Sequence, residues 1–195
     1  MTMPFDALSD ASDEALLVAY GNGDNAAASA LVMRLTPRVL GYAARVLGDR
    51  AEAEDVVQEA MLRLWRIAPD WRQGEAKVTT WLYRVTVNLC TDRLRKSGRS
   101  VEIDAVVEPD DGRASIEATL IQTDRAAALQ TALETLPERQ RQAVVLRHIE
   151  GLSNPEIAGI MDIGTEAVES LTARGKRALV RILSDRREEL GYDYD

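Results

Sequence analysis

The stretch that decides the fold of the second half of the chain is Asn154–Leu179, NPEIAGIMDIGTEAVESLTARGKRAL. Apolar residues such as Ile157 and Met161 recur at helical spacing, and Val168 continues the pattern after a break. The break is Asp162-Ile163-Gly164, a tight turn in which glycine would supply a positive φ without strain. The stretch therefore predicts two short helices that cross steeply.

Such a hairpin has two interpretations. It is either a helix-turn-helix, whose second helix lies in the major groove of DNA, or an αα-hairpin whose basic end only complements the helix dipole. The residues predicted to face the groove are Glu166, Glu169, Ser170 and Arg174, and the basic cluster that follows is Arg174, Lys176, Arg177 and Arg181. The two glutamates weigh against DNA, because carboxylates repel phosphates, although a glutamate can accept from cytosine N4.

Capping patterns extend the helical prediction upstream. Thr135-x-x-Glu138, with Pro137 in the first turn, predicts the start of a helix that Gly151 closes. Ser153-x-x-Glu156 predicts the start of the next helix, Gly164 breaks it, and Thr165 is expected to cap a long helix to about residue 185.

The first half of the chain also predicts helices. The first runs from Ser12 to Gly21, and the second runs from Asp24 to Gly48 with an interruption at Pro37. A third opens at Asp49, with Glu52 completing a capping box, and Pro69 ends it. After a loop, the last helix covers residues 79–96.

Residues 98–123 separate these two groups of helices. They hold six Asp or Glu and two Lys or Arg, together with Gly and Pro, and show no long periodicity. We interpret them as an acidic linker, the alternative being an ordered acidic loop. The predicted fold is all-α, with two small helical domains (1–97 and 124–195) joined by this linker (98–123), the second domain containing the helix-turn-helix.

The helix that opens at Asp49 carries an unusual polar stripe. Glu52, Asp55, Glu59, Leu62 and Arg66 are spaced three or four apart and share one side. The apolar residues that face the core instead are predicted to be Val57, Met61, Leu64 and Trp65. An apolar anchor within a polar rim is typical of a docking surface; a solvated face with one stray leucine is the alternative.

Residues 63–96 are basic within an acidic chain, with eight Lys or Arg against three Asp or Glu. Four polar residues form one stripe on the last helix: Arg84, Asn88, Thr91 and Arg95. Cations for phosphates, aromatic rings for stacking and an amide for base edges suit single-stranded nucleic acid. We expect Trp81 to belong to the core, whereas Trp71 lies in a polar loop and is the better candidate for base contact.

Composition excludes several kinds of site. Cys90 is the only cysteine and His148 the only histidine, so neither an internal disulfide nor a Cys/His zinc cluster is expected, and Cys90 is expected to be a small buried hydrophobe. We find no nucleophile–base pair, phosphate loop or cofactor motif and expect no enzyme, metal, cofactor or small-molecule substrate. Without a signal peptide or a long apolar run, we expect a cytoplasmic protein that does not insert into membranes.

Three blocks of sequence, in this order, resemble one family. They are DRAEAEDVVQEAMLRLWR (49–66), TTWLYRVTVNLCTDRLRK (79–96) and LETLPERQRQAVVLRHIEGLSNPEIAGIMDIGTEAVESL (133–171). They resemble the extracytoplasmic-function sigma factors, the two-domain promoter-specificity subunits of bacterial RNA polymerase. The resemblance covers roughly residues 12–97 and 124–183, which is most of the chain.

The resemblance implies a role for each surface. The polymerase-docking residues would be Asp55, Gln58, Glu59, Leu62 and Arg66. The residues that melt and read the minus-ten element would be Trp71, Arg72, Lys77, Arg84, Asn88, Thr91, Arg95 and Lys96. The residues that read the minus-thirty-five element would be Thr165, Glu166, Glu169, Ser170, Arg174, Lys176 and Arg177. The segment VESLTARGKR departs from the family pattern, and we expect Gly175 to interrupt its helix and promoter preference to differ.

The expected partners are core RNA polymerase, promoter DNA and an anti-sigma factor. The alternative is a conventional helix-turn-helix regulator that binds duplex DNA without polymerase; a helical adaptor is a third possibility. A net charge of −8 favours the sigma factor, because a free-standing DNA binder gains most of its affinity by neutralising phosphates. The isolated chain is therefore expected to bind DNA negligibly.

Overall fold

The chain folds into helices, and no strand occurs among the residues that the structure describes, so the all-α prediction is confirmed. The computed structural model describes residues 10–72, 74, 77–96, 98 and 116–184, with the backbone alone for 116–123. The first group of elements is α2 (Asp13–Gly21), α3 (Asn25–Leu47), α4 (Arg50–Ile67), the 3-10 turn η1 (Ala68–Asp70) and α5 (Val78–Lys96). The second group is α6 (Ile116–Glu134), α7 (Glu138–Val144), the π-helical turn η2 (Val145–Ile149), α8 (Asn154–Met161) and α9 (Thr165–Ser184).

The starts predicted for the first three helices are confirmed by their caps. The side chains of Ser12, Asp24 and Asp49 accept hydrogen bonds from backbone N–H groups in the first turns of α2, α3 and α4. Gly48 ends α3 in the left-handed conformation, with φ of 69°. These caps satisfy backbone donors and acceptors that a helix end leaves unpaired.

Pro37 does not interrupt the second helix, contrary to the prediction. α3 runs unbroken for 23 residues with Pro37 inside it. Proline removes the bond to the carbonyl of Met33, four residues earlier. Pro37 and Met33 are both exposed, Met33 at 78%, so water can satisfy that carbonyl.

The interpretation of residues 98–123 as linker needs one correction. α6 begins at Ile116, so the last part of the predicted linker is helix. The acidic residues at 102–111 lie outside the described residues. The end predicted for α9, near residue 185, also lies at the edge of the described residues, and α9 is helical to Ser184.

The two capping boxes predicted in the second domain have different outcomes. At Ser153 the box is present: the Ser153 side chain accepts from the backbone N–H of Glu156, and Oε2 of Glu156 accepts from the backbone N–H of Ser153 at 3.0 Å and from its hydroxyl at 2.7 Å. At Thr135 the prediction is wrong. The Thr135 hydroxyl donates back to the carbonyl of Ala132 at 2.7 Å, and α7 has Pro137 as its N-cap without a side-chain bond.

The turn between α8 and α9 exists, but glycine does not supply its positive φ. Asp162 adopts the left-handed conformation (φ 54°, ψ 51°), whereas Gly164 is not among the residues with positive φ. Aspartate is one of the few non-glycine residues that adopt this region readily. Thr165 is the first residue of α9 rather than its cap, and the carbonyl of Gly164 accepts from the N–H groups of Ala167 and Val168.

Gly175 does not interrupt α9, which is continuous from Thr165 to Ser184. It is buried where α9 crosses α7. A Cβ at this position would lie 2.5 Å from Cγ2 of Val144 and 3.3 Å from the carbonyl oxygen of Gln140. The glycine therefore permits a close helix crossing, as small residues do at packed interfaces.

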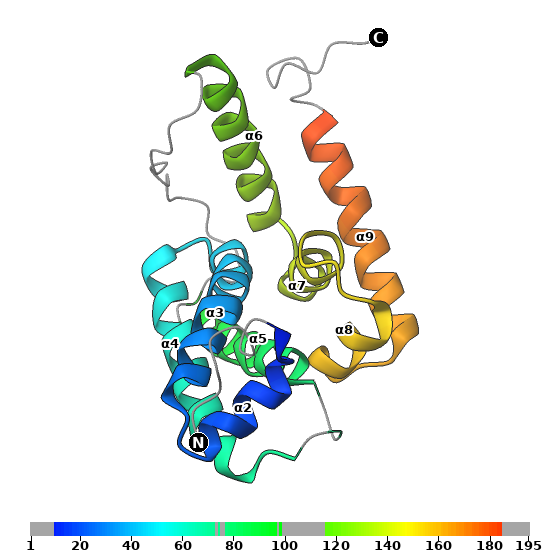
Figure 1. Cartoon of the computed structure of the whole chain (residues 1–195). Helices are drawn as coiled ribbons and strands as arrows, with labels where there is room; N and C mark the ends of the chain where they lie inside the picture. The colour runs from blue at the N-terminus through cyan, green and yellow to red at the C-terminus, as the bar shows by residue number, and fades with distance from the viewer. Residues whose placement is uncertain (1–9, 73, 75–76, 97, 99–115, 185–195) are drawn as a thin grey trace.

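The core runs through both groups of helices as one cluster of buried side chains. Tyr42 and Tyr83 meet edge to face inside the first group, with ring centroids 5.8 Å apart. Cys90 is fully buried, as predicted, and burial raises the pKa of its thiol to about 12. Figure 1 shows α2 to α5 gathered at one end, α8 beside α5, and α6 and α9 extending away from them.

Candidate functional site

The α4 face, which we define by the five predicted docking residues, is present on the surface. Asp55, Gln58, Leu62 and Arg66 are exposed, and Glu59 is half-buried. Leu62 is 50% exposed although its neighbours Met61 and Leu64 are buried. Trp65, expected in the core, is half-buried and packs edge to face on Tyr20 at 4.8 Å. An exposed leucine within charged residues is the geometry of a docking anchor.

Arg93 of α5 lies against the acidic end of the α4 face. Its Nη1 is 2.5 Å from Glu52 and 3.7 Å from Asp55, and the hydrogen bond to Glu52 raises the pKa of Arg93. Within α4, Arg63 donates to Glu59 at 2.6 Å. The cation of Arg93 is thus directed at α4, so the basic residues of the 63–96 segment do not all share one surface. No sequence pattern indicates this pairing.

The predicted stripe on α5 is present, and we call it, with its flanking cations, the α5 face. Arg84, Asn88 and Arg95 are exposed in one row, and Thr91 is half-buried. The three flanking cations are exposed as well: Arg72, Lys77 and Lys96. The α5 face thus consists of the polar row on α5 with exposed cations before it and at its end.

Trp71 and Trp81 lie together beside the α5 face. Both are half-buried against the core, and their rings meet edge to face with centroids 6.4 Å apart. Trp71 follows η1 outside any helix, as predicted, but it packs on the core as Trp81 does. Its indole N–H is buried without a hydrogen-bond partner among the described residues, which leaves a donor available beside the loop.

Carboxylates of the second domain cover part of the α5 face. Lys77 donates to Glu156 at 2.9 Å, and Arg84 lies 4.0 Å from Asp162. Farther along α5, the hydroxyl of Thr91 donates to Glu138 at 2.8 Å. The reason is that α8, which carries Glu156 in its first turn, packs against α5. Figure 1 shows the two helices side by side. These acidic side chains therefore pair with polar and basic side chains of the α5 face.

Glu156 has two roles in this contact. Its carboxylate accepts from Ser153 at the start of α8 and from Lys77 of the first domain. The backbone hydrogen bond from Ser153 and the side-chain bond from Lys77 lower the pKa of Glu156 to about 2. The hydrogen bond with Glu156 likewise raises the pKa of Lys77. Both groups therefore remain charged across the physiological pH range.

Two further contacts join the domains between these ion pairs. The hydroxyl of Tyr83 donates to Glu150 at 2.5 Å, and burial, together with this bond, raises the pKa of Tyr83. The side-chain amide of Gln142 donates to the Thr91 hydroxyl at 2.9 Å. Exposed ion pairs contribute about 1 kcal/mol or less each and weaken with salt. These exposed pairs therefore contribute little to holding the domains together, which depends mainly on the buried core that both groups of helices share.

Arg141 makes a buried polar link between the domains. Its Nη1 donates to the carbonyl of Val46 in α3 at 2.7 Å, and its Nη2 donates to the carbonyls of Glu134 and Leu136 at 2.7 and 3.3 Å. Burial lowers the pKa of Arg141. Two of its three acceptors belong to its own domain, so separating the domains would cost it one bond. Sequence periodicity gives no indication of this role.

The predicted residues of α9 form a surface of their own, which we call the α9 face. Six of them are exposed and Ser170 is half-buried: Thr165, Glu166, Glu169, Ser170, Arg174, Lys176 and Arg177. Glu169 accepts from the side-chain amide of Asn154 at 3.3 Å, across the turn. One of the two acids that weigh against DNA binding is therefore partly engaged within the hairpin.

The described residues hold no group of three or more His, Cys, Asp or Glu placed to bind a metal ion. Over that same part of the chain, no helix is long and apolar enough to cross a membrane. What the geometry offers is three polar surfaces, of which the α5 face is partly covered.

Comparison with known families and proteins gives consistent matches. Residues 31–100 match the family Sigma-70 region 2, and residues 126–179 match the family Sigma-70, region 4. The RNA polymerase sigma-H factor of Pseudomonas aeruginosa is 30% identical over 90% of this chain and 96% of its own length. The ECF RNA polymerase sigma factor SigW of Bacillus subtilis is 31% identical over 84% of this chain and 92% of its own length.

Two solved structures resemble the fold. CnrH in complex with the cytosolic domain of CnrY has a TM-score of 0.66 and 26% identity, covering 89% of this chain and 97% of that one. The sigma factor RpoE of Bartonella quintana in complex with the anti-sigma factor NepR has a TM-score of 0.65 and 22% identity, covering 78% and 94%. Both domains of this chain therefore have counterparts in known folds.

Proposed function

This chain belongs to the extracytoplasmic-function sigma factors of RNA polymerase, and from that premise we propose how its three surfaces divide transcription initiation. The α4 face docks on core RNA polymerase, with Leu62 as its apolar anchor. The α5 face melts and reads the minus-ten element. The α9 face contacts the duplex minus-thirty-five element through the major groove. The chain confers promoter specificity and is not itself an enzyme.

The assignment of the α5 face is supported by charge and by row geometry. Arg84 and Arg95 lie one and two turns from Asn88, so two cations can hold the backbone while an amide contacts a base edge. Trp71, Trp81 and the unpaired indole N–H lie beside that row. Unstacking a base costs a few kcal/mol, which such contacts must offset.

The observation that carries the proposal is the covering of the α5 face by Glu156, Asp162 and Glu138. Lys77 and Arg84 keep 68% and 52% of their side-chain surface exposed, so these carboxylates compete with phosphates for the two cations. Full engagement of promoter DNA therefore requires the second domain to leave α5, and core polymerase, by engaging both domains, supplies the free energy for that separation. A conventional regulator gains nothing from such a covering, which disfavours the alternative.

An anti-sigma factor is the regulator we propose. Of the structural neighbours, RpoE of Bartonella quintana is bound to one, and CnrH is bound to the cytosolic domain of CnrY. For this chain the exposed Leu62 within the α4 face is the surface such a partner would cover. Core polymerase and promoter DNA place the proposed activity in the cytoplasm.

Run-off transcription tests the proposal. Core polymerase transcribes genomic fragments with and without the chain, and the isolated chain is tested for DNA binding in parallel. The proposal expects chain-dependent transcripts from a defined set of fragments and negligible binding by the chain alone. Tight, sequence-specific binding by the isolated chain would overturn it.

Two variants locate the activity on the α5 face. Arg84→Ala and Asn88→Ala are expected to impair promoter opening more than core binding, because both side chains are exposed on α5 and away from α4. Leu62→Ala is the matched variant on the α4 face and is expected to weaken core binding instead. Equal losses of both activities in the α5 variants would contradict the division.

A further inference from the structure

Helix α2 contacts both ends of the segment that leads into α5. Of this segment, residues 68–77, the structure describes 68–72, 74 and 77, which include Trp71, Arg72 and Lys77 of the proposed minus-ten surface. The start of α2 meets the end of the segment, and the end of α2 meets its beginning. The match to the family Sigma-70 region 2 begins at residue 31, so α2 lies outside it.

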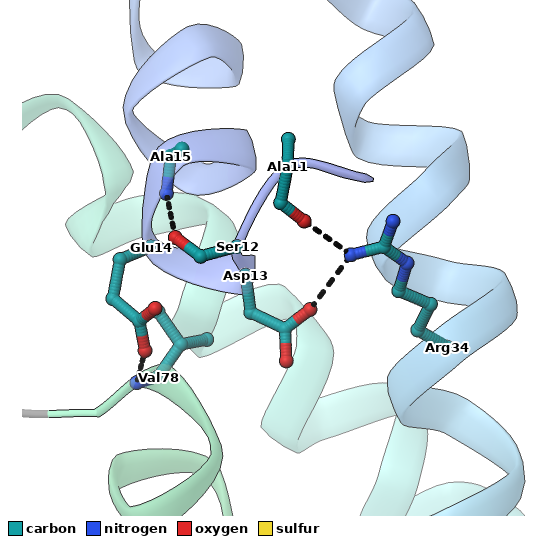
Figure 2. A network of polar contacts seen from close by, with 7 residues as sticks. All are labelled: Ala11, Ser12, Asp13, Glu14, Ala15, Arg34 and Val78. Carbon is teal, nitrogen blue, oxygen red and sulfur yellow. Dashed lines mark hydrogen bonds and ion pairs between the residues drawn. The ribbon is translucent and has the colours of Figure 1, made fainter. Parts of the chain in front are cut away.

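At the end of the segment, Glu14 closes the first turn of α5. Its Oε1 accepts from the backbone N–H of Val78, the first residue of α5, at 3.0 Å (Figure 2). This is a cap supplied by another helix rather than by the residue before Val78. A carboxylate at a helix N-terminus satisfies an unpaired donor and complements the helix dipole.

The surroundings of Glu14 favour its ionised form, the carboxylate that accepts this bond. Burial on its own raises the pKa of Glu14, but the backbone N–H groups of Glu14 and Val78, the Ser12 hydroxyl and Lys77 together lower it. Lys77 directly precedes Val78, so the hydrogen bond that fixes the backbone of Val78 also fixes the direction in which the Lys77 side chain extends.

At the beginning of the segment, Gly21 allows the end of α2 to approach backbone. A Cβ on Gly21 would lie 2.7 Å from the carbonyl oxygen of Ala68 and 3.3 Å from Cα of Pro69. Both are backbone atoms of η1, which cannot move aside as a flexible side chain can. Any larger residue at this position must therefore displace η1 and the segment that it begins.

The start of α2 is itself anchored on its other side. Arg34 of α3 donates to the carbonyl of Ala11 at 2.7 Å and to Asp13 at 3.4 Å, and the Ser12 side chain accepts from Ala15 (Figure 2). In Figure 2 the carboxylates of Asp13 and Glu14 point to different helices, one to α3 and the other to α5. α2 is thus fixed to α3 independently of its contact with α5.

We propose that α2 is a bracket that positions the minus-ten segment, with Glu14 and Gly21 as its positioning residues. The proposal rests on the assignment of the α5 face to the minus-ten element. Neither residue needs to touch DNA. Glu14 and Gly21 set the distance between the two ends of the segment, and so the placement of Trp71 and Lys77 relative to Arg84.

The test uses holoenzyme reconstituted with the full chain and a promoter recovered by run-off transcription. Open complexes are measured by permanganate reactivity of unpaired thymines and by single-round transcription, and core affinity is measured by fluorescence anisotropy. Glu14→Ala is expected to lower open-complex formation about five- to tenfold, the scale of losing one helix cap, while core affinity stays at the wild-type value. Gly21→Ala is expected to have the same effect.

Three variants separate positioning from a general structural defect. Glu14→Gln keeps an acceptor oxygen at the same reach and should restore opening, whereas Glu14→Asp is one methylene too short and should not. Asp13→Ala removes a carboxylate from the same turn of α2 but leaves both the α5 contact and the shorter bond from Arg34 to the Ala11 carbonyl, so it should open promoters normally. A template already unpaired across the minus-ten element should restore transcription by Glu14→Ala only partly, because the unpaired bases must still be held.

The outcomes are distinct. If Glu14→Ala opens promoters as well as Asp13→Ala does, or loses core affinity in proportion to opening, the bracket is overturned. Arg84→Ala is measured alongside. A defect with Arg84→Ala and none with Glu14→Ala overturns the bracket alone, and normal opening with Arg84→Ala overturns the α5 assignment together with the bracket that depends on it.

Discussion

Replacing Gly175 by alanine should destabilise the second domain, against the usual effect of that change in a helix. The added Cβ would lie 2.5 Å from Cγ2 of Val144, a separation that real Cβ contacts do not show. Relieving such overpacking in a core costs about 1–3 kcal/mol. Alanine returns about 1 kcal/mol through its higher helix propensity. We therefore expect a net loss of about 1 kcal/mol in the free energy of unfolding.

A double-mutant cycle in urea unfolding, followed by circular dichroism, measures this contact. Val144→Ala alone removes the clashing methyl and should cost about 1–3 kcal/mol, because Val144 is buried. In the double variant with Gly175→Ala, the loss in the free energy of unfolding should be smaller than the sum of the two single losses by about 1 kcal/mol, since one methyl partly replaces the other.

Gly159→Ala is the matched control, because a Cβ there has nothing within 4 Å. It lies inside α8 and should stabilise the chain by about 0.5–1 kcal/mol. If Gly175→Ala stabilises the chain as Gly159→Ala does, or if its effect simply adds to that of Val144→Ala, α9 does not cross α7 as described.

Three further predictions concern single side chains. Cys90, with its pKa raised to about 12 by burial, should not react with a disulfide reagent at pH 8 until the chain unfolds; fast native reaction would contradict its burial. Arg141→Ala should lower the free energy of unfolding in urea by about 2–3 kcal/mol, because it leaves three backbone carbonyls without their donor; a loss below 0.5 kcal/mol would contradict the link. Because the pKa of Glu156 is lowered, its stabilising effect is fully present above about pH 4.5 and lost as pH falls to about 2; the stability difference from Glu156→Gln should shrink over that window, and a constant difference would be inconsistent.

Local sequence signals predicted the starts of helices correctly where one contact between residues close in the chain determines the start. Ser12, Asp24, Asp49 and Ser153 start helices, and each of these caps involves atoms within three residues of the cap. The predictions were wrong at positions where residues distant in the chain, or exposure to solvent, determine whether the helix continues. Pro37 is tolerated where it and Met33, whose carbonyl loses its helical donor, are exposed, and a larger residue at Gly175 is disfavoured by Val144, a side chain 31 positions earlier in the chain.

The surfaces were predicted by spacing, but their relation to each other was not. The rows on α4, α5 and α9 follow from residues three or four apart, which the sequence displays directly. The pairing of Lys77 with Glu156, or of Arg93 with Glu52, joins residues far apart in the chain and leaves no periodic trace. That Glu14 closes α5 has no local signal either, since an acid near the start of α2 is equally expected for α2 itself.

The covering of the α5 face in the free chain, and its release by polymerase, is tested most directly by a distance between the domains. Spin labels at Ser29→Cys on α3 and Ala173→Cys on α9 use exposed positions, the first outside the three faces and the second among the residues of the α9 face, which carries no DNA in this measurement; buried Cys90 stays unlabelled. We predict a single narrow distance distribution for the free chain that shifts to longer distances when core polymerase is added. A broad distribution in the free chain, or the same narrow one in both states, would contradict the account.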